Sequence, residues 1–128
     1  MVVADTHAFV WWVAAPDRLS EAAADALGDA DQVGISTHTC LEIAWLVASK
    51  RLVLSLEVLA WLKAALAKPG VTLLQVTPEI AVTASRLTAL VGRDPADCVI
   101  TATAMLHAVP LVTRDEPIRA AGVVATVW

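Results

Sequence analysis

Residues 93–104 read Arg-Asp-Pro-Ala-Asp-Cys-Val-Ile-Thr-Ala-Thr-Ala, and the rest of the chain is organised around this stretch. Asp94 is placed to cap a helix, Pro95 to be its first residue and Asp97 its third. No Asp, Glu, Lys or Arg then follows until Arg114, which predicts a buried helix with two carboxylates at its N-terminus. Capping alone would explain both acids, so a functional interpretation needs support from other segments.

The length and composition predict one domain and a cytoplasmic location. A chain of 128 residues holds one hydrophobic core but is short for two, so we expect a single domain over residues 1–128. No apolar run reaches the roughly 18 residues of a membrane span, and no basic segment precedes an apolar one as in a secretory signal. Cys40 and Cys98 are too few for a disulfide framework and too far apart for a zinc knuckle. A reducing cytoplasm is therefore the expected location.

The charge and the aromatic residues restrict the kind of partner. A formal net charge of −4 argues against a protein that holds nucleic acid on a broad basic face. It does not exclude an enzyme that meets phosphates through a bound cation, because such an ion can dominate the local charge. The five tryptophans, beside one phenylalanine and no tyrosine, indicate an apolar surface that a partner covers.

Short apolar runs alternate with helical patterns along the whole chain. Strands are expected at residues 2–4, 32–36, 71–76, 110–113 and 123–127, the last at an edge of the sheet. Helices are expected at residues 7–14, 20–30, 39–49, from a cap at Ser55 to 67, 77–91, 95–107 and 117–120. This alternation predicts an α/β fold with a mostly parallel sheet and helices on both faces. Right-handed crossovers then bring every strand-to-helix turn to one edge of the sheet.

Glu42 is the most informative isolated acid. Between Asp31 and Lys50 it is the only Asp, Glu, Lys or Arg, so no lysine or arginine on its own helix can pair with it. We expect it in the first turn of that helix. An exposed glutamate, or one bonded to His38, is the simpler alternative. A lone carboxylate in so apolar a helix is costly unless a cation or donor meets it, which favours a functional role.

Four acids from separate segments are expected to meet at the carboxyl edge of the sheet: Asp5, Glu42, Asp97 and Asp115. Converging carboxylates repel one another and take up protons unless a cation is present. Oxygen ligands select hard ions, so Mg²⁺ or Mn²⁺ is expected. Such an ion polarises a phosphoryl oxygen and activates water. The resulting hypothesis is metal-assisted phosphodiester hydrolysis, with Arg93 and Arg114 beside site acids to steer phosphates.

Four segments, in order, resemble the motifs of PIN-domain ribonucleases of the VapC toxin type, from bacterial toxin–antitoxin pairs. They are residues 3–7, residues 35–36 with 41–44, residues 93–97 and residues 111–115. The resemblance implies a three-layer α/β/α sandwich and Mg²⁺-dependent cleavage of RNA, often tRNA or ribosomal RNA. It also implies a homodimer or a toxin–antitoxin hetero-oligomer, with a VapB-type antitoxin lying across the active groove.

The same resemblance assigns roles to individual residues. Asp5, Glu42, Asp97 and Asp115 match the acidic quartet, as catalytic and metal-binding residues, with Asp5 and Asp97 as direct ligands. Asp94 matches an extra acid. Thr113 matches a hydroxyl beside the site. The candidate substrate-binding residues are Thr6, Thr113, Arg93 and Arg114.

Two positions depart from the family pattern. Cys98 stands where many relatives carry arginine, and Gly92 stands where a histidine is frequent. Both departures leave the acidic quartet intact, but they put a local ion pair or contact with substrate in question.

Four other functions compete with this hypothesis. A haloacid-dehalogenase-type phosphatase needs a second aspartate two residues after Asp5, where His7 stands. A receiver domain needs a lysine near the site, and no lysine is so placed. A zinc hydrolase built from His7, His38 and His107 lacks ligand spacing. A catalytically inactive interaction module, whose acids only cap helices, would explain the tryptophans but not Glu42.

Overall fold

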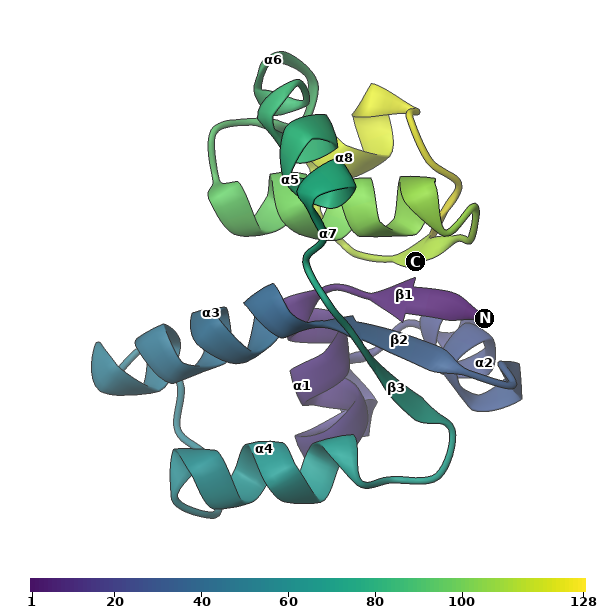
Figure 1. Cartoon of the computed structure of the whole chain (residues 1–128). Coiled ribbons are helices and arrows are strands. Elements are labelled where there is room, and N and C mark those ends of the chain that lie inside the picture. The colour runs from purple at the N-terminus through teal and green to yellow at the C-terminus, as the bar shows by residue number, and fades with distance from the viewer.

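The computed structural model describes all residues, 1–128, and builds them around one five-stranded parallel sheet (Figure 1). The strands are β1 (Val2–Ala4), β2 (Val33–Ser36), β3 (Val71–Leu74), β4 (Leu111–Val112) and β5 (Thr126–Val127). Their order across the sheet is β3-β2-β1-β4-β5, and every neighbouring pair is parallel. The predicted α/β class with a mostly parallel sheet is therefore confirmed, and β5 does form an edge.

Helices cover both faces of this sheet and make three layers. They are α1 (Thr6–Ala14), the short 3₁₀ helix η1 (Pro16–Arg18), α2 (Glu21–Asp29), α3 (Thr37–Ala48), α4 (Val58–Leu66), α5 (Pro78–Ser85), α6 (Thr88–Val91), α7 (Pro95–Leu106) and α8 (Glu116–Ala121). One buried cluster takes its helical residues from α1 to α4 and the other from α5 to α8. Figure 1 shows α1 and α4 on one side of the sheet, and α5, α7 and α8 on the other.

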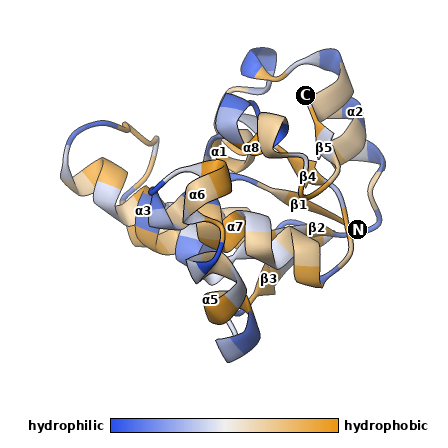
Figure 2. Cartoon of the chain, turned by 90° about the horizontal axis from the view of Figure 1, so that it is seen from above, coloured by the Kyte–Doolittle hydropathy of each residue, from blue (hydrophilic) through white to orange (hydrophobic).

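Burial of apolar side chains on these two faces supplies the main stabilisation of the fold. In Figure 2, β1 is hydrophobic along its length, whereas hydrophilic positions gather in the loops and the outer helical turns. No helix in the structure combines the length and the apolar character that a membrane crossing needs.

The strand order places a crevice at the carboxyl ends of β1 and β4. From β1 the chain steps outward through β2 to β3, and then returns to form β4 on the other side of β1. The register pairs Ala4 with Val112, so the turns that follow these two strands lie side by side. In open parallel sheets, ligands bind at such a reversal of strand order.

The cap of α4 differs from the prediction. The helix begins at Val58 and its cap is Glu57, whose two carboxylate oxygens accept from the N–H groups of Leu59 (3.0 Å) and Ala60 (3.1 Å). Ser55 makes no such bond, so its assignment as the cap was wrong. A carboxylate that satisfies two of the free N–H groups at a helix start outcompetes a single hydroxyl further upstream.

The single helix expected over residues 77–91 is also wrong, because α5 and α6 are separate. At the end of α5 the N–H groups of Arg86 and Leu87 bond to the carbonyls three residues back, which tightens the last turn and ends the helix. The outer strands β3 and β5 are shorter than expected, because the strands beside them offer few residues to pair with. β3 ends at Leu74 because its partner Ser36 is the last residue of β2, and β5 pairs only with the two residues of β4.

Candidate active site

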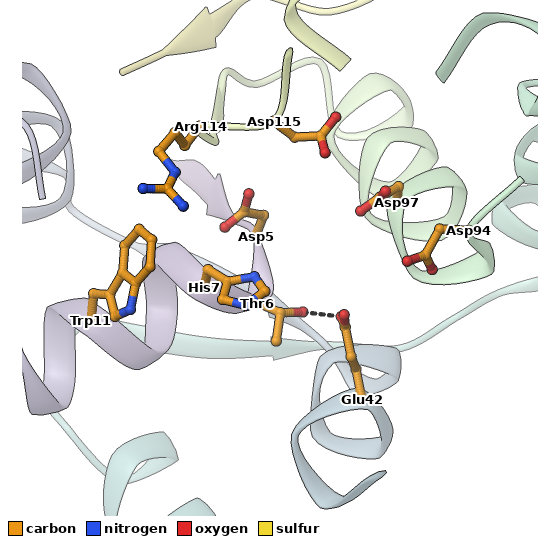
Figure 3. A pocket seen from close by; sticks show the side chains of 9 residues that line it. All are labelled: Asp5, Thr6, His7, Trp11, Glu42, Asp94, Asp97, Arg114 and Asp115. Carbon is orange, nitrogen blue, oxygen red and sulfur yellow. Dashed lines mark hydrogen bonds between the residues drawn. The ribbon is translucent and has the colours of Figure 1, made fainter. Parts of the chain in front are cut away.

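A pocket of about 270 Å³ opens at the crevice between the ends of β1 and β4, and five carboxylates line it (Figure 3). Its lining residues are Asp5, Thr6, His7, Trp11, Glu42, Asp94, Asp97, Arg114 and Asp115. The structure thus brings together all four acids of the predicted quartet and the extra Asp94. Thr6 and Arg114 also line the pocket, whereas Arg93 is exposed outside it. The expectation that Arg93 meets substrate beside these acids is not supported, because its side chain does not reach this pocket.

Three of the acids are helix caps as well as pocket residues. In each of them Oδ1 accepts a backbone N–H at the start of a helix: Asp5 from Ala8 (2.7 Å), Asp94 from Ala96 (2.9 Å) and Asp115 from Ile118 (3.0 Å). The N-termini of α1, α7 and α8 therefore all face the pocket, and their positive dipole ends favour anions there. Capping and a functional role are compatible, because a cap uses only one of the roughly four lone pairs that the two oxygens of a carboxylate offer.

Asp5 is held through both of its carboxylate oxygens. Its second oxygen, Oδ2, accepts a hydrogen bond from the hydroxyl of Thr113. Burial raises the pKa of Asp5, and the donors Thr113 and Ala8 partly offset that rise. Thr113 is itself completely buried and does not line the pocket. Its contact with substrate stays a prediction that this buried position does not favour, and its hydrogen bond makes it a support for Asp5.

Glu42 enters the pocket from α3. The helix begins at Thr37 with Ser36 as its cap, two residues earlier than expected, so Glu42 lies in the second turn rather than the first. Its Oε2 accepts a hydrogen bond from the hydroxyl of the buried Thr6. His38 does not bond to it, so the simpler alternative of a Glu42–His38 contact is excluded.

Asp97 has no hydrogen-bond partner and is the electrostatic centre of the cluster. Partial burial first, and then repulsion from the other pocket carboxylates, raise its pKa from the usual 3.8 to about 7. The contributing carboxylates, in decreasing order, are Asp94, Asp115, Glu42 and Asp5. A group in this position exchanges a proton near neutral pH, and a bound cation would favour its charged form.

The pocket fits a hydrated hard cation better than a fully protein-coordinated one. All the acidic donors are oxygens and none is paired with a lysine or arginine, since the one ion pair in the chain joins Arg119 to Glu116. No group of three His, Cys, Asp or Glu side chains is arranged to hold one metal ion in common. Magnesium commonly keeps several waters and binds one or two carboxylates directly, which suits this geometry. Zinc needs about four ligands at close range, and the three histidines do not supply them.

The two departures from the family pattern contact each other. Gly92 adopts a positive φ of 97°, a conformation that glycine reaches at little cost. The thiol of Cys98 donates a hydrogen bond to the carbonyl oxygen of Gly92 at 3.1 Å. Burial, followed by repulsion from Asp97 and Asp94, raises the pKa of Cys98, so the thiol keeps its proton. This bond links the loop before α7 to the first turn of that helix.

Trp11 is a pocket residue that the sequence did not single out. It stands one turn after His7 on α1, with the two ring centroids 5.6 Å apart. The Cζ atom of Arg114 lies 4.7 Å from the centroid of the Trp11 ring. In Figure 3, Arg114 and Trp11 lie on one side of the pocket, and Asp94 and Asp97 lie on the other. A tryptophan in an apolar helix resembles any core residue, so only its arginine neighbours could have marked it.

Comparisons with known proteins agree with this architecture. The PIN domain profile matches residues 2–124. Over 118 residues the chain is 41% identical to ribonuclease VapC22 of Mycobacterium tuberculosis, covering 92% of this chain and 89% of that protein.

Two solved structures share the fold. VapBC2 from Rickettsia felis, bound to a DNA fragment from its promoter, has a TM-score of 0.71 at 12% identity. A toxin–antitoxin complex from Klebsiella pneumoniae has a TM-score of 0.69 at 21% identity. Each match covers 98% of this chain and 97% of the other. At such identities the likeness concerns the fold alone.

Proposed function

The chain belongs to the PIN domain family, in its VapC-type branch, and from this premise we propose that it is a metal-dependent endoribonuclease toxin neutralised by a cognate antitoxin. One observation carries the proposal. Five carboxylates from four separate segments converge in one pocket at the reversal of strand order, and none of them has a basic partner. An interaction module has no need of such a cluster, because repulsion among its members costs stability.

The residues proposed to hold Mg²⁺ or Mn²⁺ are Asp5 and Asp97 directly, with Glu42, Asp115 and Asp94 around them. A bound ion supplies charge that polarises the phosphoryl oxygen and lowers the pKa of an attacking water. Asp97, with its pKa about 7, gives up its proton when a cation binds. The hydroxyl of Thr113 donates to the carboxylate of Asp5, and that of Thr6 donates to the carboxylate of Glu42. These hydrogen bonds keep the two carboxylates in one orientation, ready to bind a metal ion.

The proposed VapB-type antitoxin lies across the carboxylate pocket and also covers apolar surface elsewhere on the chain. A groove of about 590 Å³ runs between α1 and α4 and is lined mainly by apolar residues. Val53, at its rim, is 89% exposed, and Leu56 is 53% exposed. The predicted tryptophan surface is only partly present: Trp61 is buried in this groove, whereas Trp45 is 62% exposed on α3.

We propose that the chain is cytoplasmic and that it forms a homodimer or a toxin–antitoxin hetero-oligomer. Both cysteines are free, which agrees with a reducing compartment. Light scattering from the purified chain, alone and with its antitoxin, measures the oligomeric state directly.

The test of the proposed function is RNA cleavage by the purified chain, with the new RNA ends located by sequencing. We expect cleavage of tRNA or ribosomal RNA with Mg²⁺ or Mn²⁺, and none in excess chelator. Asp5→Asn and Asp97→Asn should each lower the rate by on the order of 100-fold or more, because they alter the proposed direct ligands. Asp29→Asn, an exposed acid at the end of α2 that lines neither this pocket nor the apolar groove, is the matched control.

Two results contradict the proposal. Full activity of both pocket variants, or full activity in excess chelator, removes the metal-dependent mechanism. Absence of cleavage for every RNA, with metals present and the chain folded, leaves the interaction module as the better account.

A further inference from the structure

A second cavity, of about 280 Å³, opens beside the carboxylate pocket and has no acidic residue in its lining. Thr6, His7, Trp11 and Arg114 line both cavities, so the two spaces are contiguous. A ligand that occupies the carboxylate pocket and extends past Trp11 therefore enters the second cavity.

Three arginines from three different segments line this second cavity. Arg18 ends η1, Arg51 follows α3 and Arg114 follows β4. None of the three takes part in an ion pair, and none of their guanidinium groups donates a hydrogen bond within the chain. Three unpaired guanidinium groups in one cavity repel one another, in a chain that has an excess of acids. An anion in the cavity would relieve that repulsion.

Trp11 holds two of these guanidinium groups in place. The Cζ atoms of Arg18 and Arg114 lie 5.0 Å and 4.7 Å from the centroid of its ring, within the range of cation–π attraction. The ring is only 6% exposed, so it forms a fixed platform. A guanidinium that stacks on an aromatic ring keeps the N–H groups along its edge free, and these form the fork that matches phosphate geometry.

We propose that Arg18, Arg51 and Arg114 form a phosphate-binding subsite for the RNA strand, next to the position of the scissile phosphate at the carboxylates. The inference rests on the proposed ribonuclease function and adds to it the path of the substrate. A polyanion approaching an acidic protein and an acidic pocket needs local attraction, and this cavity provides it. The substrate is therefore a strand with at least two phosphates, one in each cavity.

Direct binding of a nuclease-resistant RNA tests the subsite without cleavage. The probe is a fluorescently labelled 2′-O-methyl RNA of about 12 nucleotides, and its anisotropy is measured in chelator over a range of salt concentrations. Arg18→Ala and Arg51→Ala should each weaken binding about tenfold. The slope of log affinity against log salt should become shallower by about 0.7 for each phosphate that the variant no longer neutralises. Arg86→Ala, an exposed arginine at the end of α5 that lines neither cavity, should bind as the unaltered chain does.

Steady-state cleavage adds a second measurement. Because the subsite grips a phosphate that does not react, Arg18→Ala and Arg51→Ala should raise KM about tenfold and change kcat by less than about threefold. Both side chains are exposed, so the variants should keep the melting temperature of the unaltered chain.

Several outcomes would overturn the subsite. They are absence of RNA binding by the unaltered chain, arginine variants that bind normally, and an Arg86→Ala variant that weakens binding equally. An acidic peptide that binds through these arginines while RNA does not would assign the cavity to a protein partner instead. Arginine-dependent RNA binding without any cleavage would refute the proposed ribonuclease function and leave the subsite standing. RNA cleavage with a rate and KM that the arginine variants do not change would refute the subsite and leave the ribonuclease function standing.

Discussion

The hydroxyl of Thr113 donates a hydrogen bond to Oδ2 of Asp5, across the ends of two adjacent strands and 108 residues of sequence. The other oxygen of Asp5 accepts from the backbone N–H of Ala8. Both oxygens are therefore held, and the carboxylate keeps one orientation at the pocket. The same two donors limit the rise that burial causes in the pKa of Asp5.

Replacing Thr113 by valine keeps the shape of the side chain and removes the donor. The unsatisfied oxygen of Asp5 should cost on the order of 1–3 kcal/mol of unfolding free energy. Without the donor the pKa of Asp5 rises further, so the acidic limb of the pH–activity profile should move to higher pH. Denaturant unfolding and a pH profile of RNA cleavage measure the two effects.

Thr113→Ser is the matched control for this bond, because serine keeps the hydroxyl and loses only a methyl group. Its pH profile should follow that of the unaltered chain. A valine variant whose pH profile is also unchanged would show that the bond does not position Asp5.

The raised pKa of Asp97 predicts that the metal-free chain loses stability as pH rises. The folded pKa, about 7, lies above the ordinary value of 3.8, so the folded state binds the proton more tightly than the unfolded chain does. This contribution is complete below about pH 4 and is lost as pH rises through 7. The loss should be on the order of 1–2 kcal/mol, a value reduced for solvent screening because the carboxyl is partly exposed.

Urea unfolding in chelator between pH 4 and pH 8, with Asp97→Asn beside the unaltered chain, measures this loss. The asparagine variant should show a flatter dependence on pH, because it removes the titrating group. Equal slopes for both proteins would mean that Asp97 is ionised throughout this range.

The positions of the acids were predictable because they depend on backbone topology. Asp5 and Asp115 each follow a strand, and the carboxyl ends of parallel strands share one edge of the sheet. Asp97 follows a helix start marked by Asp94 and Pro95. These local features of the sequence predict the strand ends and the helix start, so the members of the cluster could be named before its geometry was known.

The supporting contacts were not predictable because they join side chains from distant segments. Nothing local in the sequence shows that Thr113 turns into the core beneath Asp5, or that Trp11 collects arginines from η1 and from the turn after β4. The start of α3 was misplaced because Ser36, the last residue of a strand, also caps the helix. Because Ser36 both ends β2 and caps α3, no loop residue lies between the two elements to mark the start of the helix in the sequence.

Glu42→Gln separates the charge of this residue from its hydrogen bond. The amide oxygen of glutamine can still accept from Thr6, while the negative charge that helps to raise the pKa of Asp97 is gone. The metal-free variant should be more stable at pH 8 by about 0.5–1 kcal/mol, and less active with metal. Glu21→Gln, an exposed acid at the start of α2, should change neither quantity. A loss of stability in Glu42→Gln equal to that in Thr6→Val would show that the hydrogen bond, not the charge, dominates at this position.

Divalent metal should raise the melting temperature of this chain, because a cation removes the repulsion that raises the pKa of Asp97. At a metal concentration ten times the dissociation constant, the gain is about 1.4 kcal/mol, which corresponds to several degrees for a domain of this size. The gain should be larger at pH 8 than at pH 5, because protonated carboxyls bind metal weakly.

Differential scanning fluorimetry with millimolar Mg²⁺ or Mn²⁺, and with Ca²⁺ for comparison, measures the shift. Asp97→Asn should show a smaller shift and Asp29→Asn the full one. If melting curves were the same with metal and with chelator at both pH values, the five carboxylates would have to tolerate one another without a cation, and the proposed metal site would be refuted while the fold stood unchanged.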